Sequence, residues 1–327
     1  MFVPTTFAAA LIMTILSTIC WGSFANTFKL TKNYRFELYY WDYAAGIFLI
    51  SIVLAFTMGS MSGGDSTFLS NLHTAAPINL AWAAIGGFIF NIANVLLIAG
   101  IEIVGLAIAF PISIGIALVE GVVLSYALQP KGNGGLLAAG VVMAVLAVIM
   151  IGLAYGQLQN SNRMVSRKGV WVCIISGLLM GTFAPFVARA MTAARPLTPY
   201  TVAVFFTLGA VICCFFFNTY LMKKPLVGEP VDFSGYAGAP ASYHALGLIG
   251  GTVWGIGTVF NFVAASLVGV AISYAIGQAS PMIAALWGVF VWREFRGSNR
   301  KAKMYLVGMF VFYVLALVLI ARAYQAG

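Results

Sequence analysis

The chain has 327 residues, of which 62% are hydrophobic and only 8% are charged, with a formal net charge of +9. A soluble domain carries about a quarter charged residues, so this composition excludes a soluble globular protein. The basic residues fall in short segments between long apolar runs, where they act as topology signals, so the positive charge does not indicate nucleic-acid binding.

The apolar runs are long enough to cross a membrane as helices. About 20 helical residues span the hydrocarbon core, and solid apolar runs fit helices better than the alternating strands of a membrane barrel. In chain order we predict ten spans, at 5–29, 38–59, 78–101, 104–128, 135–155, 168–190, 199–222, 244–267, 270–292 and 303–323. The expected fold class is therefore all-α and integral to the membrane.

The distribution of basic residues predicts the orientation of the spans. Of the 17 Lys and Arg, thirteen fall in the loops after spans 1, 5, 7 and 9, and four fall on the other side. The positive-inside rule places the richer side in the cytoplasm. Both termini are therefore expected outside, and the apolar amino terminus, which lacks a basic segment, is expected to be the first span rather than a cleaved signal.

Two pairs of segments indicate an internal repeat. Gly86–Phe110 and Gly250–Tyr274 agree at eight of 25 positions without a gap. Ser17–Asn26 and Ser176–Pro185 agree at four of ten positions. The two pairs occur in the same order and at similar offsets, which favours one repeat over chance matches between apolar segments.

The predicted repeat has a consequence for the arrangement of the halves. Each half holds five spans, and an odd number turns the second half over in the membrane. We therefore expect residues 1–156 and 157–327 to form two inverted five-helix repeats within one integrated membrane domain. Inverted repeats recur in secondary transporters, with the site midway through the lipid. A duplication in another class of membrane protein is the alternative.

Two acidic residues inside spans are candidates for proton coupling. Glu120 lies well inside the fourth span, and Asp42 lies one turn inside the second. A carboxyl within the membrane is costly unless it faces a cavity or a partner, and such groups often carry protons in transporters. We expect Glu120, or failing it Asp42, to bind and release a proton. The alternatives are a neutral Glu120 bonded to a neighbouring helix and an ion pair of Glu37 or Asp42 with Lys29 or Arg35.

Amide and aromatic side chains inside the spans predict a site for a neutral polar solute. Amides supply donors and an acceptor, and flat aromatic faces pack on sugar or nucleobase rings. The alternatives are hydrogen bonding between helices for the amides and an interfacial belt or ordinary packing for the aromatics. The candidate substrate-binding residues are Asn91, Asn94, Asn261, Gln278, Trp21, Asn26, Tyr40, Trp41, Trp254 and Tyr274.

The motifs that are missing narrow the function. The sequence has no P-loop, which argues against ATP-driven transport by this chain alone. Its two histidines, His73 and His244, are expected to be isolated, and its four cysteines show no metal-ligand spacing. We therefore expect no metal, no cofactor and no enzyme activity. The expected partners are a small polar solute, protons and the lipid bilayer, and the chain is expected to act as a monomer or a homodimer.

Five segments carry a resemblance to a known family: Cys20–Ser23, Arg35–Tyr43, Asn91–Asn94, Ala271–Pro281 and Trp287–Phe295. They resemble the drug/metabolite transporter superfamily, in the branch of bacterial glucose/ribose porters, rhamnose permease and plant ureide permeases. The resemblance covers most of the chain and implies ten helices in two inverted repeats and proton-coupled uptake of a small polar organic solute.

The short connection between the halves, Gly156–Arg167, is similar to the compact bacterial form, which implies a location in the bacterial inner membrane. Members of the superfamily usually have both termini in the cytoplasm. The distribution of basic residues places both termini of this chain outside, and we retain that prediction.

We predict a secondary active transporter that takes up a monosaccharide-like solute by alternating access and proton symport. Within the same class, the alternatives are a ureide or nucleobase carrier and a metabolite exporter. A non-transporting receptor or scaffold is the alternative from another class. An intramembrane enzyme would need a nucleophile or metal constellation, which the sequence lacks.

Overall fold

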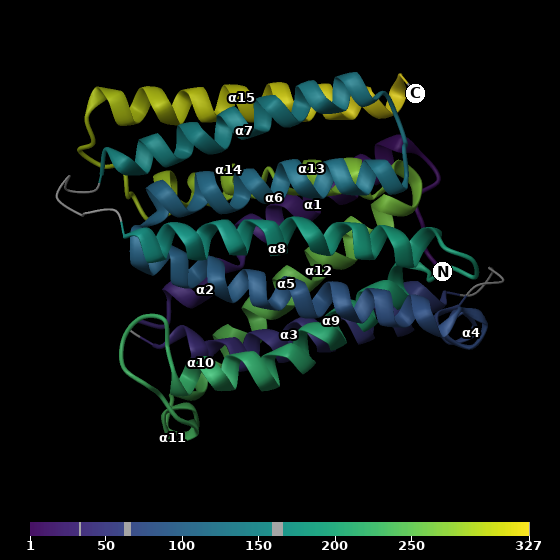
Figure 1. Cartoon of the computed structure of the whole chain (residues 1–327), viewed down its shortest axis with the longest axis horizontal. Coiled ribbons are helices and arrows are strands. Elements are labelled where there is room, and N and C mark those ends of the chain that lie inside the picture. Colours follow the sequence, from purple (N-terminus) through teal and green to yellow (C-terminus); the bar gives the residue numbers. More distant parts are fainter. Residues whose placement is uncertain (33, 62–66, 159–165, 327) are drawn as a thin grey trace. The chain divides into compact units, whose positions relative to one another are not determined.

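In the computed structural model, the residues that are described are 1–32, 34–61, 67–158 and 166–326, and their regular structure is entirely helical. Ten helices of this part of the chain are long and apolar enough to cross a membrane. The predicted all-α membrane fold is confirmed, and most predicted boundaries agree with the helix ends within a few residues (Figure 1).

The spans follow one another in the order predicted, and short helices lie between some of them. The spans are formed by α1 (Phe7–Ser23) with α2 (Ala25–Lys29), α3 (Phe36–Phe56), α5 (Pro77–Val104), α6 (Leu106–Leu128), α7 (Gly134–Gly156), α8 (Arg167–Thr192), α9 (Pro199–Cys213) with η2 (Cys214–Asn218) and α10 (Thr219–Lys223), α12 (Ala241–Val268), α13 (Val270–Gly277) with α14 (Ser280–Leu286) and η3 (Trp287–Val291), and α15 (Arg300–Gln325). The short helices are η1 (Met58–Ser60), α4 (Phe68–Thr74) and α11 (Phe233–Ala237).

Three spans depart from a single regular helix. The first is interrupted at Phe24, and the seventh and ninth contain the π-helical turns η2 and η3. The ninth also breaks after Gly277, and Pro281 stands in the first turn of the next helix, where its missing N–H is tolerated. Because π turns are frequent at functional positions, the seventh and ninth spans are candidates for motion or binding.

The chain forms two compact units, and each takes helices from both halves of the sequence. Unit 1 comprises residues 1–91 and 186–267, and unit 2 comprises residues 92–185 and 268–327. In unit 1, α3 packs against α9, and in unit 2, α6 packs against α13 and α7 against α15 (Figure 1). These helices are spans 2 and 7, 4 and 9, and 5 and 10, which hold equivalent places in the predicted repeats. The predicted division after residue 156 stays a prediction, because grouping by contact does not report ancestry.

The α5–α9 crossing in unit 1 depends on two glycines. A Cβ atom at Gly87 would overlap the carbonyl oxygen of Phe206, and one at Gly209 would overlap the carbonyl oxygen of Ala84. The backbones therefore touch, which is how small residues let membrane helices approach.

The α3–α12 crossing in unit 1 repeats this arrangement. A Cβ atom at Gly251 would overlap the carbonyl oxygen of Tyr43, and one at Gly46 would overlap that of Leu248. Positions 84 and 87 of the first crossing are 164 residues before 248 and 251, which is the offset of the aligned repeat segments. The glycine contacts thus recur at positions that the predicted repeat makes equivalent.

Two tight turns also recur at equivalent positions. Gly105 separates α5 from α6 with φ 80° and ψ 162°, and Gly269 separates α12 from α13 with φ 87° and ψ 153°. Only glycine adopts this region readily, because a side chain would collide with the backbone. The Val-Gly-x-Ala-Ile signature shared by the two segments therefore corresponds to one shared turn geometry.

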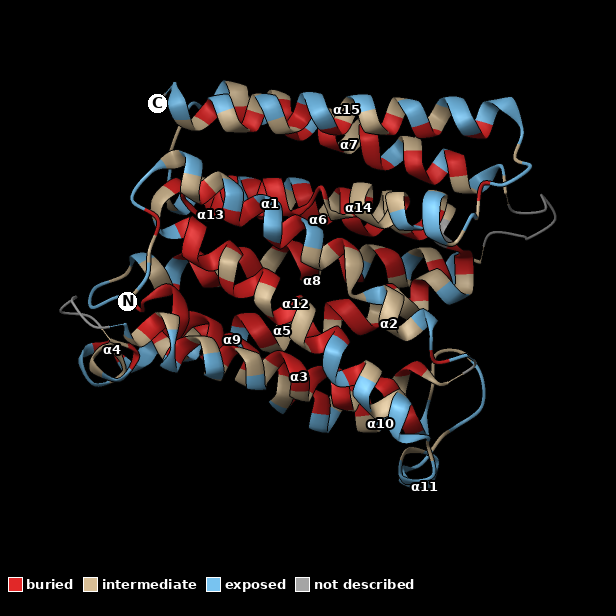
Figure 2. Cartoon of the chain, turned by 180° about the vertical axis from the view of Figure 1, so that it is seen from behind, coloured by how far each residue is buried: buried red, intermediate tan, exposed pale blue. Residues whose placement is uncertain are grey.

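The outer surface is apolar. Large hydrophobic side chains project from many helices, and Phe216 and Phe290 are each 71% exposed. Along α15, buried positions recur every three or four residues from Ala302 to Ala323, with exposed apolar residues between them (Figure 2). Soluble proteins do not expose apolar area on this scale, so this surface faces lipid and the chain is a multi-pass membrane protein.

Candidate functional site

The predicted site residues divide between the two units. Unit 1 holds Trp21, Asn26, Tyr40, Trp41, Asp42, Asn91, Trp254 and Asn261, and unit 2 holds Asn94, Glu120, Tyr274 and Gln278. Asn91 and Asn94, three residues apart on α5, fall on either side of the boundary, and both are buried.

Stacked aromatic rings surround Trp254 in unit 1. Its ring lies 6.0 Å from that of Trp21, with an interplanar angle of 19°, and 4.7 Å from that of Phe90, with an angle of 25°. The Trp21 Nε1 donates to Thr258 Oγ1 at 3.1 Å, which fixes the indole. Gly257 lets α1 approach, since a Cβ atom there would lie 3.0 Å from the Trp21 ring. We call Trp21, Tyr43, Phe90 and Trp254 the aromatic cluster.

Buried polar atoms lie beside this cluster. Tyr40 donates its hydroxyl to Asn91 Oδ1 at 2.7 Å, and Asn91 is fully buried. The amide nitrogen of Asn91 and the hydroxyls of Tyr43 and Ser17 find no hydrogen-bond partner among the described residues. The Tyr43 ring lies 5.2 Å from that of Tyr40 and 6.4 Å from that of Trp254. Because buried polar atoms are nearly always paired, these atoms point to a ligand or an ordered water.

The other unit 1 candidates make different contacts. Trp41 lies next to Tyr40 in sequence, but its Nε1 donates to Met222 Sδ at 3.2 Å and its ring packs on Phe215 and Phe233. Asn26 Nδ2 donates to Ser23 O at 2.7 Å within the first span. Asn261 is buried two turns after Trp254 on α12. These contacts leave Trp41 outside the aromatic cluster.

Asp42 binds two side chains that are far away in the sequence. Tyr236 of α11 donates to its Oδ1 at 2.7 Å, and His244 Nδ1 of α12 lies 2.8 Å from its Oδ2. The prediction that both histidines are isolated is therefore wrong for His244. Sequence patterns could not reveal this contact, because the residues lie 202 positions apart and meet only when α12 packs on α3.

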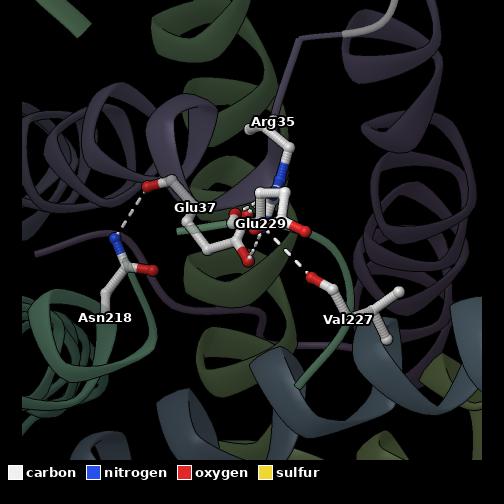
Figure 3. Close-up of polar contacts among 5 residues, drawn as sticks. All are labelled: Arg35, Glu37, Asn218, Val227 and Glu229. Carbon is white, nitrogen blue, oxygen red and sulfur yellow. Dashed lines mark hydrogen bonds and ion pairs between the residues drawn. The ribbon is translucent and has the colours of Figure 1, made fainter. Parts of the chain in front are cut away.

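Hydrogen bonds join the amino-terminal end of α3 to the loop that precedes α12. Arg35 donates Nε and Nη2 to the two carboxylate oxygens of Glu37, at 3.1 and 2.7 Å, so the alternative of a structural ion pair applies to this carboxyl (Figure 3). Arg35 also donates to the carbonyl oxygens of Val227 and Glu229. Asn218, on the π turn η2, donates to the Glu37 carbonyl oxygen at 2.8 Å. Residues 224–240, which we call the strap, thus lie against the start of α3.

Unit 2 holds the Glu120 site. Thr182 of α8 donates to Glu120 Oε1 at 2.9 Å, while Oε2 is buried and makes no hydrogen bond within the described part of the chain. A Cβ atom at Gly181 would lie 2.9 Å from that oxygen, so the carboxyl fills the space beside the glycine. Thr182 supplies a polar partner that the sequence alone did not indicate.

Tyr274 lies beside Glu120 in unit 2. Its hydroxyl lies 3.2 Å from the carbonyl oxygen of Ala117 and 3.3 Å from that of Met180. Its ring lies against Gly121, next to Glu120. Gln278, one turn after Tyr274, is buried and follows the end of α13. These contacts make Tyr274 a link between α6, α8 and α13.

The sites offer polar and aromatic chemistry. The described residues contain no group of three or more His, Cys, Asp or Glu that could hold a metal ion. Reasoning from the sequence missed His244, Tyr236, Thr182 and the unpaired hydroxyls. Tyr43 had a signal, since it ends the aromatic run that begins at Phe36.

Residues 12–322 match the family described as sugar transport protein. Ureide permease 4 of Arabidopsis thaliana is 21% identical, over 98% of this chain and 98% of its own length. Ureide permease 1 of the same plant is 21% identical over 85% and 86%. The probable glucose uptake protein GlcU of Priestia megaterium is 22% identical over 82% and 87%. A solved crystal structure shares the fold, with a TM-score of 0.64 at 17% identity over 96% of this chain and 99% of the other.

Proposed function

Since this chain belongs to the sugar transport protein family, we propose that it carries a neutral, hydroxyl-bearing solute such as a monosaccharide by proton-coupled uptake. The family and the names of the relatives make it a membrane transporter of small solutes and not an enzyme. The relatives also confirm the predicted resemblance to glucose porters and ureide permeases. The choice of solute rests on one observation: beside stacked tryptophans, buried polar atoms of Asn91 and Tyr43 have no hydrogen-bond partner within the part of the chain that the structure describes.

The chemistry of these atoms favours a hydroxylated ring. A hydroxyl can accept from the Asn91 amide and can donate to or accept from Tyr43, so one kind of group satisfies both. The half-buried ring of Trp21, which stacks on Trp254, adds an aromatic surface of the kind that packs on the apolar face of a sugar ring. An unpaired buried polar atom costs about 1–3 kcal/mol, and a bound solute would recover part of that for each atom.

The matched experiment removes one hydroxyl from inside the cluster and one from outside it. Tyr43→Phe deletes an unpaired hydroxyl beside Trp254, and Tyr313→Phe deletes another unpaired buried hydroxyl on α15. Neither variant should melt lower than the wild type without ligand, because no hydrogen bond is lost. We expect Tyr43→Phe alone to weaken sugar binding, by about 0.5–1.5 kcal/mol for one hydrogen bond. Equal binding by both variants would contradict the site.

The relatives named ureide permeases support a ureide or nucleobase as the second candidate. Amide-rich rings also pair with an amide and a hydroxyl. A thermal-shift screen of monosaccharides against allantoin, uracil and purines separates the two, because a ligand that binds only the folded state raises its melting temperature. Stabilisation by sugars alone supports the first candidate, and stabilisation by allantoin or uracil alone replaces it.

Alternating access between two inverted repeats, 1–156 and 157–327, is the proposed transport mechanism. The equivalent glycine turns at Gly105 and Gly269 and the recurring glycine crossings support a repeat. Two copies of one five-helix repeat in opposite orientations can pack in two arrangements of similar energy, and exchange between these arrangements exposes the site to each side of the membrane in turn. Cysteine labelling of substituted positions from both sides of the membrane would test the opposite orientation of the halves.

Proton coupling through Glu120, or failing it Asp42, completes the proposal. The Oε2 of Glu120 is buried and finds no hydrogen-bond partner among the described residues, and carboxyls inside membrane spans commonly belong to proton pathways. The test is solute accumulation in proteoliposomes under an imposed pH gradient, with Glu120→Gln, Asp42→Asn and the control Glu229→Gln, which changes an exposed loop side chain. If the first two variants both accumulate solute like the wild type, the coupling assignment is wrong.

We further propose the bacterial inner membrane as the location, with both termini outside. The thirteen basic residues of one side support this orientation, although Arg163 lies outside the described residues. Fusing a reporter that is active only in the cytoplasm to the carboxyl terminus tests it, since activity would contradict the orientation. The assembly is proposed to be a monomer or a homodimer, and mass measurement in nanodiscs distinguishes them.

A further inference from the structure

Asp42 lies where three elements of unit 1 meet. Its two oxygens bind Tyr236 of the strap and His244 of α12, while Asp42 itself belongs to α3. The side chain of Asp42 is 9% exposed and that of His244 is 25% exposed. The carboxyl is therefore shielded, whereas the imidazole is partly exposed.

Close packing of two backbones builds this contact. A Cβ atom at Gly247 would lie 2.5 Å from Asp42 Cβ and 3.3 Å from the Tyr39 carbonyl oxygen. Glycine thus lets α12 rest on α3 one turn beyond His244. Because the backbones of α12 and α3 are in close contact here, the short side chain of His244 reaches Asp42 directly.

The hydrogen bonds define where a proton can bind. A neutral imidazole that donates from Nδ1 to Asp42 carries its proton there and leaves Nε2 as an acceptor. A proton at Nε2 converts a pair with one negative charge into a pair with none. The chain has two histidines, and His73 is an exposed residue of α4. An imidazole is the side chain that ordinarily changes charge between about pH 5 and 8.

The groups around the pair do not compete for this proton. Burial and then the charge of Asp42 raise the pKa of Tyr34 to about 12. Burial, the hydrogen bond to Asp42 and its charge raise the pKa of Tyr236 well above its ordinary value. Tyr39 and Tyr243 are the neighbouring phenols on α3 and α12. The nearby guanidinium of Arg35 is paired with Glu37. The phenols of Tyr34 and Tyr236 therefore remain neutral in the range where an imidazole titrates.

We propose that Asp42 and His244 form one proton-binding site, in which Asp42 holds His244 and Nε2 of His244 takes up the proton. Binding of the proton stands on this geometry alone, while its use in transport rests on the proposed function. His244 is thus assigned as the titrating partner of Asp42.

The first test detects the proton directly, without any solute. Protein labelled with ¹⁵N-histidine, in nanodiscs, gives signals from two histidines, and His73→Asn and His244→Asn assign them. We expect the neutral His244 ring to carry its proton on Nδ1 at the alkaline end of the range and to become an imidazolium at the acid end, between about pH 5 and 8. In Asp42→Ala we expect the neutral ring to lose its preference for a proton on Nδ1, because the carboxylate that accepts from Nδ1 is gone. A His244 ring that stays neutral throughout, or one that carries its neutral proton on Nε2, would overturn the proposal.

The second test asks whether this proton drives transport. His244→Asn retains an N–H near the place of Nδ1, so it can keep the bond to Asp42 but cannot titrate. We expect it to melt like the wild type and, with coupling through Asp42 rather than Glu120, to lose accumulation of D-glucose under a pH gradient, while His73→Asn keeps it. Undiminished accumulation by His244→Asn would overturn the role in coupling. If the wild type moves no D-glucose, the proposed sugar fails, and the histidine signals still decide whether the proton site exists.

Discussion

Replacing Gly87 with alanine tests how closely α5 and α9 pack in unit 1. The new Cβ atom would overlap the carbonyl oxygen of Phe206 and would lie 2.6 Å from its carbonyl carbon and 3.0 Å from its Cα. These are backbone atoms, so no side-chain rotation relieves the overlap and the two helices must move apart. Overpacking costs about 1–3 kcal/mol, and we expect a fall in the free energy of unfolding near the upper value because the whole crossing shifts.

The assay is thermal unfolding in detergent, with Gly115→Ala as the matched control. A Cβ atom at Gly115 of α6 meets nothing within 4 Å, so this alanine is expected to be neutral or stabilising by up to about 1 kcal/mol. Gly251→Ala, at the equivalent crossing against Tyr43, should melt low like Gly87→Ala. If Gly87→Ala and Gly115→Ala melt at the same temperature, the reasoning is refuted, since it depends on the backbone contact.

Three further changes probe single contacts. Tyr40→Phe removes the donor to Asn91 Oδ1, and leaving that buried acceptor unpaired should lower the free energy of unfolding by about 1–3 kcal/mol, measured as a lower melting temperature; an unchanged value would mean that the bond adds no stability. Thr182→Val removes the donor to Glu120 Oε1 at nearly constant volume, and we expect a lower melting temperature, because that oxygen loses its partner, together with weaker accumulation driven by a pH gradient; wild-type accumulation would contradict a role for the bond. Gly269→Ala forces a side chain into φ 87°, which should cost about 1–3 kcal/mol and reduce the yield of folded protein; a wild-type melting temperature and yield would show that the turn relaxes.

The ten spans were predictable because each is a local property of the chain. A run of about twenty apolar residues must be helical in lipid, since its backbone groups have no other partners. The two tight turns also leave a signal in the sequence. Both aligned segments carry a Val-Gly pair, at 104–105 and at 268–269, and both glycines have a positive φ.

The polar sites were only partly predictable. The sequence indicated Glu120 and Asp42 because a carboxyl inside an apolar run is rare, and it indicated the aromatic run that contains Tyr40. It could not tell that Trp41 packs on Phe215 while its neighbour Tyr40 binds Asn91. Adjacent residues of a helix point in different directions, and which direction is polar depends on the helices beside it.

What the sequence determined alone is the set of membrane helices and the residue types they carry, because burial of backbone polar groups in lipid leaves one local solution. What only the tertiary structure decided is which distant side chains meet. His244 reaches Asp42 across 202 residues because glycines at 247 and 251 let α12 lie directly on α3. Contacts of this kind depend on the fit of two helix surfaces, and no pattern within either helix specifies them.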